Sequence, residues 1–105
     1  MKKELLSLLL FCLSFNLFSQ SPTAAFSVDP SSLEACVGDT IRFTDLSATN
    51  GGPNIVSWTW TFGDGLSSNE QNPYVIYSSD GIKTVTLSIL NSQAEGSQIQ
   101  ETLTI

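Results

Sequence analysis

Three segments of the chain alternate between apolar and polar residues with a period of two, at residues 40–44, 56–62 and 84–89. Successive side chains of a β-strand point to opposite faces, so this period predicts strands that are buried on one face. β-branched and aromatic residues fill the three segments, as strands prefer. The positions expected to face a core are Ile41 and Phe43, then Val56, Trp58, Trp60 and Phe62, then Val85, Leu87 and Ile89.

Weaker apolar runs predict further strands at residues 24–28, 74–77 and 99–105. In the last run Glu101 shares the parity of the apolar residues, which indicates a β-bulge or an edge position. We find no stretch with helical periodicity and helix caps. The chain is therefore expected to be all-β.

Turn-forming residues separate the predicted strands. Gly, Pro, Asn and Asp gather at residues 29–32, 50–54, 63–65, 72–73 and 80–81. Each of these clusters supplies a positive φ, a fixed φ or a side chain that closes a turn. Several short strands at this spacing indicate a β-sandwich or a β-barrel.

Residues 1–20 have the pattern of a signal peptide. Two lysines precede an apolar stretch at residues 5–18, which is shorter than the about 20 apolar residues that span a bilayer. A buried core helix is the alternative, and the N-terminal position and the lysines disfavour it. We expect cleavage near Gln20–Ser21, one domain over residues 22–105, and a secreted or cell-surface location.

The chain is acidic, with ten Asp and Glu, four Lys and Arg, and no His. Without residues 1–20 it keeps Arg42 and Lys83 against nine acidic residues, a net charge of −7. Affinity for nucleic acid comes mainly from Lys and Arg that neutralise phosphates, so a nucleic-acid partner is excluded. An anionic membrane surface is disfavoured for the same reason, and we expect no membrane insertion once the leader is removed.

Cys36 is the only cysteine in residues 21–105. Export implies an oxidising compartment, in which cysteines normally pair. Because no partner is present, we interpret Cys36 as a small buried hydrophobic residue. An intermolecular disulfide and a reactive thiol are the alternatives.

The composition argues against an enzyme and against most cofactors. Most nucleophile–base pairs use His, and zinc and copper sites use His or several Cys. Calcium is the one metal left open, because Asp64, Glu70 and Asp80 lie near turns and it takes oxygen ligands. Turn closure and solubility explain these acids better than a calcium loop, whose Asp-x-Asp-x-Asp-Gly pattern is missing. We expect no catalytic residue and no cofactor.

The sequence Trp-Thr-Trp-Thr-Phe-Gly-Asp-Gly at residues 58–65 resembles the signature W-x-W-D-F-G-D-G of the PKD (polycystic kidney disease repeat) domain family. The resemblance extends downstream and covers essentially all of residues 22–105. It implies an extracellular, Ig-like antiparallel β-sandwich of about seven strands. The residues that carry it are Trp58, Trp60, Phe62, Gly63, Asp64, Gly65, Asn72, Pro73, Tyr77 and Gly81.

Physical chemistry gives these signature residues a structural role. Trp60 and Phe62 are expected to fill the space between two sheets, and each aromatic buries on the order of 150–250 Å². The triplet at residues 63–65 predicts a tight hairpin with glycines at positive φ, in which Asp64 accepts backbone N–H bonds. Tyr77 is expected on the connection across the sandwich.

The chain departs from the family pattern at Thr61, where an Asp is common, and at Lys83, where an aromatic is usual. Lys83 is expected to cover the edge of the core with its stem while its ammonium reaches water. Bacterial relatives often pair a cysteine at the Cys36 position with one near Asn91, and residues 91–96 contain none. The resemblance therefore implies that the usual disulfide is lost.

The resemblance implies a non-catalytic extracellular module for adhesion, for spacing of neighbouring domains, or for contact with a protein or a polysaccharide. The alternative is a substrate-binding accessory domain of a larger secreted hydrolase, a polysaccharidase or a protease, truncated at residue 105. An exposed aromatic ring would favour the alternative, because flat rings stack on sugars. Tyr74 is the best candidate for such a contact, although a core position is favoured for each of these aromatics, Tyr74 and Trp58 included.

Overall fold

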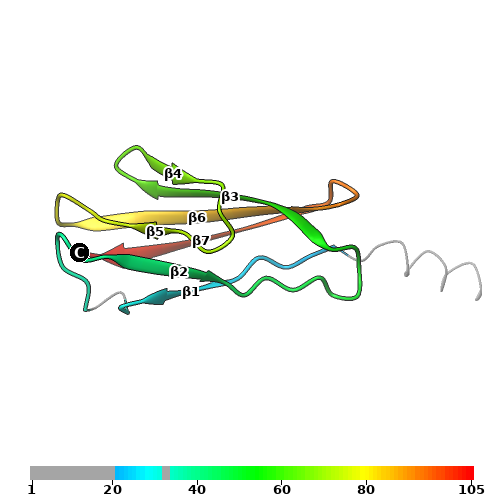
Figure 1. The fold of residues 1–105 in the computed structure, drawn as a ribbon, viewed down its shortest axis with the longest axis horizontal. Coiled ribbons are helices and arrows are strands. Elements are labelled where there is room, and N and C mark those ends of the chain that lie inside the picture. The colour runs from blue at the N-terminus through cyan, green and yellow to red at the C-terminus, as the bar shows by residue number, and fades with distance from the viewer. Residues whose placement is uncertain (1–20, 32–33) are drawn as a thin grey trace, which may run out of the picture.

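The computed structural model describes residues 21–31 and 34–105, so the expected signal peptide lies outside the described residues. The described chain forms seven strands in two antiparallel sheets, as expected from the alternating segments (Figure 1). No helix in residues 21–31 and 34–105 is long and apolar enough to cross a membrane. The strands are β1 (Phe26–Asp29), β2 (Ile41–Asp45), β3 (Ile55–Gly63), β4 (Leu66–Ser68), β5 (Tyr74–Val75), β6 (Ile82–Asn91) and β7 (Gly96–Thr104).

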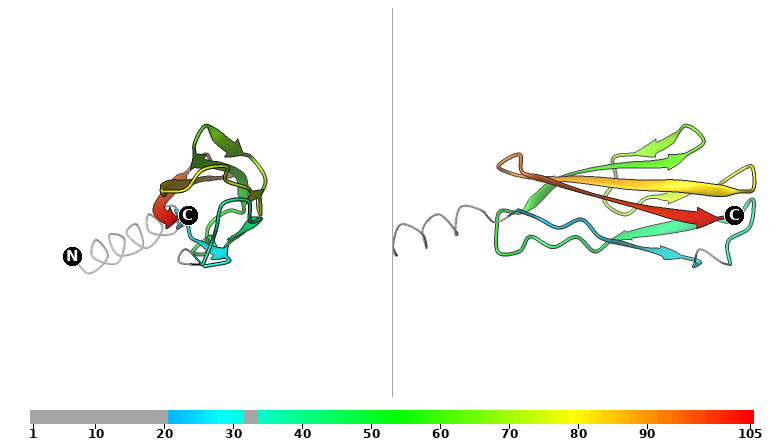
Figure 2. Two further views of the ribbon diagram at one scale, coloured as in Figure 1. Left: turned by 90° about the vertical axis from the view of Figure 1, so that its left-hand side faces the viewer. Right: turned by 180° about the vertical axis from the view of Figure 1, so that it is seen from behind.

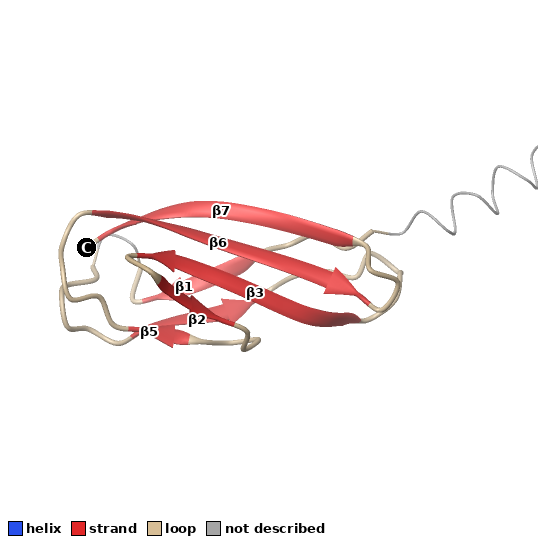
Figure 3. Cartoon of the chain, turned by 90° about the horizontal axis from the view of Figure 1, so that it is seen from above, coloured by secondary structure: helices blue, strands red, loops and turns tan. Residues whose placement is uncertain are grey.

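The two sheets differ in size. The small sheet has the order β1-β2-β5, and the large sheet has the order β4-β3-β6-β7. Strands β3, β6 and β7 run along most of the molecule, and the shorter strands of the small sheet lie against them (Figures 2 and 3). The fold is therefore a sandwich, and the barrel alternative does not apply.

Aromatic rings from both sheets fill the space between them. Phe26 of β1 and Phe43 of β2 meet Trp60 and Phe62 of β3, with the Phe26–Trp60 centroids 5.1 Å apart and the Phe43–Phe62 centroids 4.9 Å apart. Ring pairs at 4.5–7 Å stabilise a core beyond the area that they bury. Around this cluster lie the aliphatic residues expected from the pattern: Ile41, Val85, Leu87 and Ile89.

The start of β3 differs from the expected pattern. The pairing of β3 with β6 shifts by one residue between Ile55 and Ser57, so a bulge lies at Val56. One extra residue reverses the parity before it, which leaves Val56 exposed and half-buries Ile55. The prediction that Val56 faces the core was wrong for this reason.

Strand β7 is an edge strand of the large sheet. It pairs with β6 from Ile82–Thr104 to Leu90–Gly96 without a register shift, so the edge alternative for Glu101 holds and the bulge does not. Glu101 has the parity of the core and is exposed. A charge placed at an edge in this way discourages pairing with another chain.

Candidate functional site

The signature hairpin joins β3 to β4. Gly63 pairs with Leu66, and the two residues between them, Asp64 and Gly65, have φ of 53° and 77°. Two central residues with positive φ define a type I′ turn, whose twist matches that of the flanking strands. The tight hairpin was therefore predicted correctly, although strand β4 itself was not.

The Asp64 carboxylate has a different role from the one predicted. It accepts hydrogen bonds from Lys83 Nζ at 2.7 Å and from Ser79 Oγ at 3.4 Å, and not from backbone N–H groups. The reason is the nearby ammonium of Lys83, whose side chain is only 6% exposed and needs an anionic partner. The hydrogen bond from Lys83 holds the pKa of the Asp64 carboxyl below its ordinary value.

The stem of Lys83 lies in the edge of the core as expected, and its ammonium binds to partners within the protein. It donates to Asp64 and to Ser79 Oγ, the latter at 2.9 Å, and it lies 5.5 Å from the centre of the Tyr77 ring. An ammonium over an aromatic face is attracted by the ring quadrupole. Lys83 thus ties the β3–β4 hairpin to β6.

Tyr77 lies on the connection from β5 in the small sheet to β6 in the large sheet. Its side chain is fully buried, and its hydroxyl donates to the carbonyl oxygen of Phe62 at 2.7 Å. Burial raises the pKa of Tyr77 to about 12, and the charge of Asp64 acts in the same direction. The hydroxyl therefore bonds as a neutral donor that fastens the connection to β3.

Both tryptophans are committed to the scaffold. Trp60 is fully buried and donates its indole N–H to the carbonyl oxygen of Glu70 at 2.9 Å. Trp58 is half-buried and donates to Asp45 Oδ2 at 2.9 Å. Burial raises the pKa of Asp45, but hydrogen bonds from Ser47, Gln71 and Trp58 outweigh it and leave the pKa below its ordinary value.

The remaining signature residues sit in turns. Asn72 Oδ1 accepts from the backbone N–H of Asp45 at 2.8 Å, and the carbonyl of the buried Pro73 accepts from Phe43 at 2.9 Å. Gly81 has φ of 113° just before β6, a conformation that side chains rarely adopt. These contacts hold the loop between β4 and β5 against β2.

The structure does not bring the three carboxylates considered for calcium into one site. In residues 21–31 and 34–105, no group of three His, Cys, Asp or Glu side chains could hold a metal ion. Asp64 is already bonded to Lys83, while Glu70 and Asp80 are exposed in separate loops. Calcium gains no support from this arrangement.

Cys36 is exposed, so its interpretation as a buried residue was wrong. It lies in a turn before β2, where its N–H donates to Asp39 Oδ2 at 2.9 Å and its carbonyl accepts from Asp39 at 3.1 Å. The neighbouring Ala35 occupies the buried position instead. No disulfide partner for Cys36 lies among the described residues.

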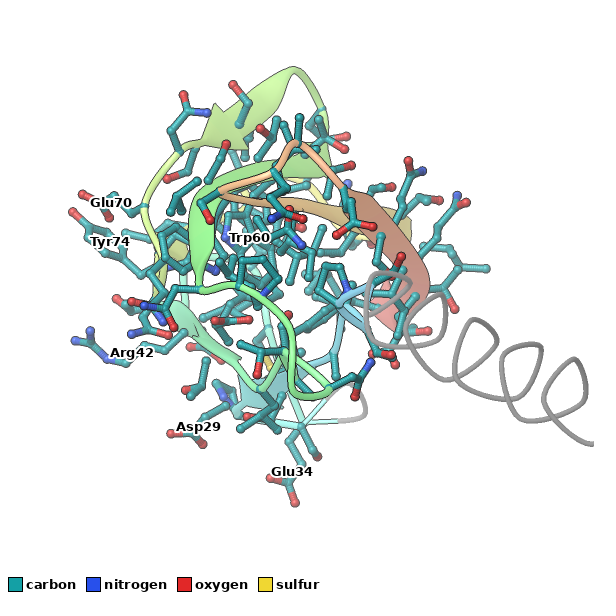
Figure 4. The ribbon with its side chains drawn as sticks, turned by 90° about the vertical axis from the view of Figure 1, so that its right-hand side faces the viewer. Asp29, Glu34, Arg42, Trp60, Glu70 and Tyr74 are labelled. Carbon is teal, nitrogen blue, oxygen red and sulfur yellow. The ribbon has the colours of Figure 1, made fainter. Side chains whose placement is uncertain are left out.

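Tyr74 projects from the outer surface of the small sheet. In register across the three strands lie Asp29 of β1, Arg42 of β2 and Tyr74 of β5, and residues directly opposite in a sheet share a face. All three side chains are exposed, Tyr74 by 60%. Figure 4 shows them pointing outward along one side of the molecule, while Trp60 lies in the interior.

We call this row, with Ser27 and Thr44 beside it, the charged face. Among the described residues the one ion pair joins Lys83 and Asp64, so the Arg42 guanidinium has no carboxylate partner there. From the sequence, Tyr74 is the best candidate for an exposed ring but a core position is favoured for it, and its exposure corrects that prediction. The neighbours of Tyr74 were not predicted. The alternation of β2 places Arg42 outward; its position beside Tyr74 depends on a strand pairing that local patterns do not show.

The two antiparallel sheets, the Greek-key-like separation of neighbouring strands and the buried tyrosine between sheets define an Ig-like β-sandwich. The chain matches the PKD domain over residues 19–105, and it therefore belongs to the PKD domain family. This membership agrees with the resemblance carried by residues 58–65.

Two relatives are bacterial collagenases. Collagenase ColA of Bacillus cereus is 32% identical over 69 residues, which is 66% of this chain and 7% of that protein. A microbial collagenase of Vibrio alginolyticus is 39% identical over 57 residues, which is 54% of this chain and 7% of that protein. The chain thus spans only a small part of the length of these enzymes.

Solved structures agree on the fold. The PKD1 domain from the Vibrio cholerae metalloprotease PrtV has a TM-score of 0.69 at 27% identity, covering 81% of this chain and 96% of that domain. A structure of carbohydrate-binding modules from the β-sandwich superfamily has a TM-score of 0.74 at 23% identity, covering 81% of this chain and 34% of that chain. Because only 23% of the residues are identical, the similarity to the carbohydrate-binding modules concerns the fold alone.

Proposed function

We propose that this chain is a non-catalytic extracellular module that binds a macromolecule through its charged face. The observation that carries the proposal is the exposed ring of Tyr74 in register beside the unpaired guanidinium of Arg42. Tyr and Arg are enriched at the energetic centres of protein interfaces, because they bury much area and bond at the same time. The large aromatics of the signature are buried or, in the case of Trp58, half-buried.

A protein is the ligand that the comparisons favour. The relatives are collagenases, enzymes named for a protein substrate, and the matching segment forms about 7% of each. A small segment of a large enzyme suits a role in holding the enzyme to its substrate. From the two lysines and the apolar stretch at residues 5–18 we propose that residues 1–20 direct export and are removed near Gln20–Ser21.

The second candidate is that the chain is one accessory domain of a longer secreted hydrolase. The matched segment covers only 7% of the length of each collagenase, which supports this candidate. The gene sequence that follows the codon for Ile105 tests it directly. A protease or polysaccharidase domain encoded in frame would favour this candidate, and an immediate stop codon would contradict it.

Co-sedimentation with insoluble collagen fibres tests the proposed binding. The full chain, exported from a bacterial host, is mixed with fibres, and the bound fraction is measured for the wild type, Tyr74→Ala and Arg42→Ala. Truncating a central interface residue costs about 2 kcal/mol or more, so each variant should bind roughly thirtyfold more weakly. Val56→Ala is the matched control, because Val56 is similarly exposed on the other sheet.

Three results would contradict the proposal. Wild-type chain that stays in the supernatant would remove the binding function for this ligand. Equal binding by Tyr74→Ala, Arg42→Ala and the control would place any contact elsewhere. Peptide release by the wild type, lost in a folded variant, would show that the chain is an enzyme.

A further inference from the structure

The outer surface of the large sheet has a second, chemically different array. Directly paired residues form rows across the strands, such as Thr59–Ser88–Gln98 and Thr61–Thr86–Gln100. Ser67 of β4 extends the second row, because it pairs with Thr61. We call this surface the neutral face; its polar residues are Ser57, Thr59, Thr61, Ser67, Thr84, Thr86, Ser88, Gln98, Gln100, Thr102 and Thr104. The exposed Ile82 and Leu90 lie on it too, because they pair with Thr104 and Ser57.

The neutral face carries no charge although the chain is strongly acidic. Its side chains are hydroxyls and amides with the two aliphatic residues Ile82 and Leu90, while residues 21–105 hold nine acidic side chains. The two acids on or beside β7 do not reach this face: Glu95 accepts a hydrogen bond from Asn91 Nδ2 at 3.0 Å, and Glu101 has the parity of the core. An acidic chain has thus kept one whole sheet surface free of charge.

The polar groups of the neutral face are available to a ligand. Within the described part of the chain, the side-chain hydrogen bonds of β3, β6 and β7 belong to residues off this face, namely Trp58, Trp60, Lys83, Asn91 and Ser97. Paired strands lie about 4.8 Å apart, and alternate residues of one strand about 6.7 Å apart. The hydroxyls and amides therefore form a regular lattice of donors and acceptors.

A shallow depression of about 430 Å³ lies at one end of this face. Gly96 has no side chain, and the exposed Leu90 supplies an apolar wall beside the polar groups of Ser57, Thr59, Ser88 and Gln98. The depression thus combines one apolar surface with several hydroxyl and amide groups. A sugar ring is complementary to this combination, because it has C–H groups on its faces and hydroxyls at its rim.

We propose that the neutral face binds an uncharged polysaccharide chain. A polyhydroxyl ligand matches a lattice of hydroxyls and amides, and neither partner has to desolvate a charge. A second protein copy fits less well, because protein interfaces favour aromatic residues, Met and Arg and are depleted in Ser. The inference is independent of the proposed function, since the two faces belong to opposite sheets.

Retention of the exported chain on insoluble neutral polysaccharides tests this inference. The probes are swollen cellulose, chitin, mannan and a β-1,3-glucan, and the proteins are the wild type, Thr59→Glu, Thr59→Val and the control Thr44→Glu. Thr44 is an exposed strand threonine on the charged face, so its substitution makes the same chemical change on the other sheet. Urea unfolding of each variant verifies that the fold is kept.

We expect retention on at least one probe, lost in Thr59→Glu and unchanged in Thr44→Glu. Thr59→Val replaces the hydroxyl with a methyl group of similar size and should weaken retention roughly threefold to tenfold, the size of one neutral hydrogen bond. Retention on none of the probes, or equal retention by both Glu variants, would overturn the inference. Sedimentation that shows a wild-type dimer broken by Thr59→Glu would overturn it too, because the face would then join two copies.

Discussion

The two outer faces of the sandwich are built on one core but differ in chemistry. The charged face carries an exposed ring, a guanidinium without an ion-pair partner and a carboxylate on short strands. The neutral face carries hydroxyls, amides and two exposed aliphatic side chains, and it is built mainly on the long strands β3, β6 and β7. The comparison teaches that the inward-facing aromatic residues of the signature support both surfaces from the core, so ligand contact must be sought on the outward-facing residues of the strands.

The largest effect on the free energy of unfolding is expected from a substitution in the core, which carries both sheets. Trp60→Ala should cost about 3–5 kcal/mol, because it leaves a large cavity between the sheets. A domain of this size has a free energy of unfolding of only about 4–13 kcal/mol. The variant should be marginal or unfolded in a urea titration and should lose both binding activities together. A folded variant that lost only one activity would show that the faces do not depend on a common core.

The pH dependence of the free energy of unfolding should reveal the contribution of the Lys83–Asp64 pair to the scaffold. The pKa of Asp64 is lowered in the folded state, so its contribution to stability is complete above about pH 4 and is lost as the pH falls through the folded value. The urea midpoint of the wild type should therefore drop below pH 4, and Asp64→Asn should lack that part of the drop. Asp80→Asn, at the turn before β6, is the control and should follow the wild type. Parallel curves for wild type and Asp64→Asn would contradict the role of the Lys83–Asp64 pair.

Binding at the charged face should depend on the salt concentration, and binding at the neutral face should not. At about 1 M salt the Debye length is ~3 Å, so contacts that use Arg42 on the exposed charged face should weaken. Hydrogen bonds between neutral groups are not screened in this way, so retention on a polysaccharide should change little. Binding curves at low and high salt measure the difference. Equal salt dependence on both ligands would mean that the faces are not chemically distinct.

The smallest expected effects are those of substitutions on the two faces on the free energy of unfolding. Tyr74→Ala, Thr59→Val and Thr44→Glu alter exposed groups that make no hydrogen bond within the described part of the chain. Such substitutions usually change the free energy of unfolding by no more than about 0.5 kcal/mol. Urea midpoints close to that of the wild type are therefore expected. A loss of more than about 2 kcal/mol in Tyr74→Ala would show that Tyr74 is part of the scaffold.

The sequence predicted the strands well because alternation is a local property. Ile41, Phe43, Val85, Leu87 and Ile89 are all buried as their period indicates. The fold class and the resemblance to the PKD domain agree with the comparisons. These features required no knowledge of which strands pair.

The errors came from non-local contacts and from irregular geometry. Val56 is exposed because a bulge is set by pairing with β6, and Cys36 is exposed because it lies in a turn outside the sheets. Lys83 and Asp64 are 19 positions apart in the sequence, so no local pattern predicts their ion pair. The rows of both faces likewise exist only once the strands have paired.

The most direct test of the account assays two variants on two ligands. Tyr74→Ala and Thr59→Glu are each measured by co-sedimentation with collagen fibres and with the neutral polysaccharide that retains the wild type. The account predicts that Tyr74→Ala loses binding to collagen alone and that Thr59→Glu loses binding to the polysaccharide alone. Loss of both activities in either folded variant, or loss of neither, would contradict the assignment of two separate binding faces.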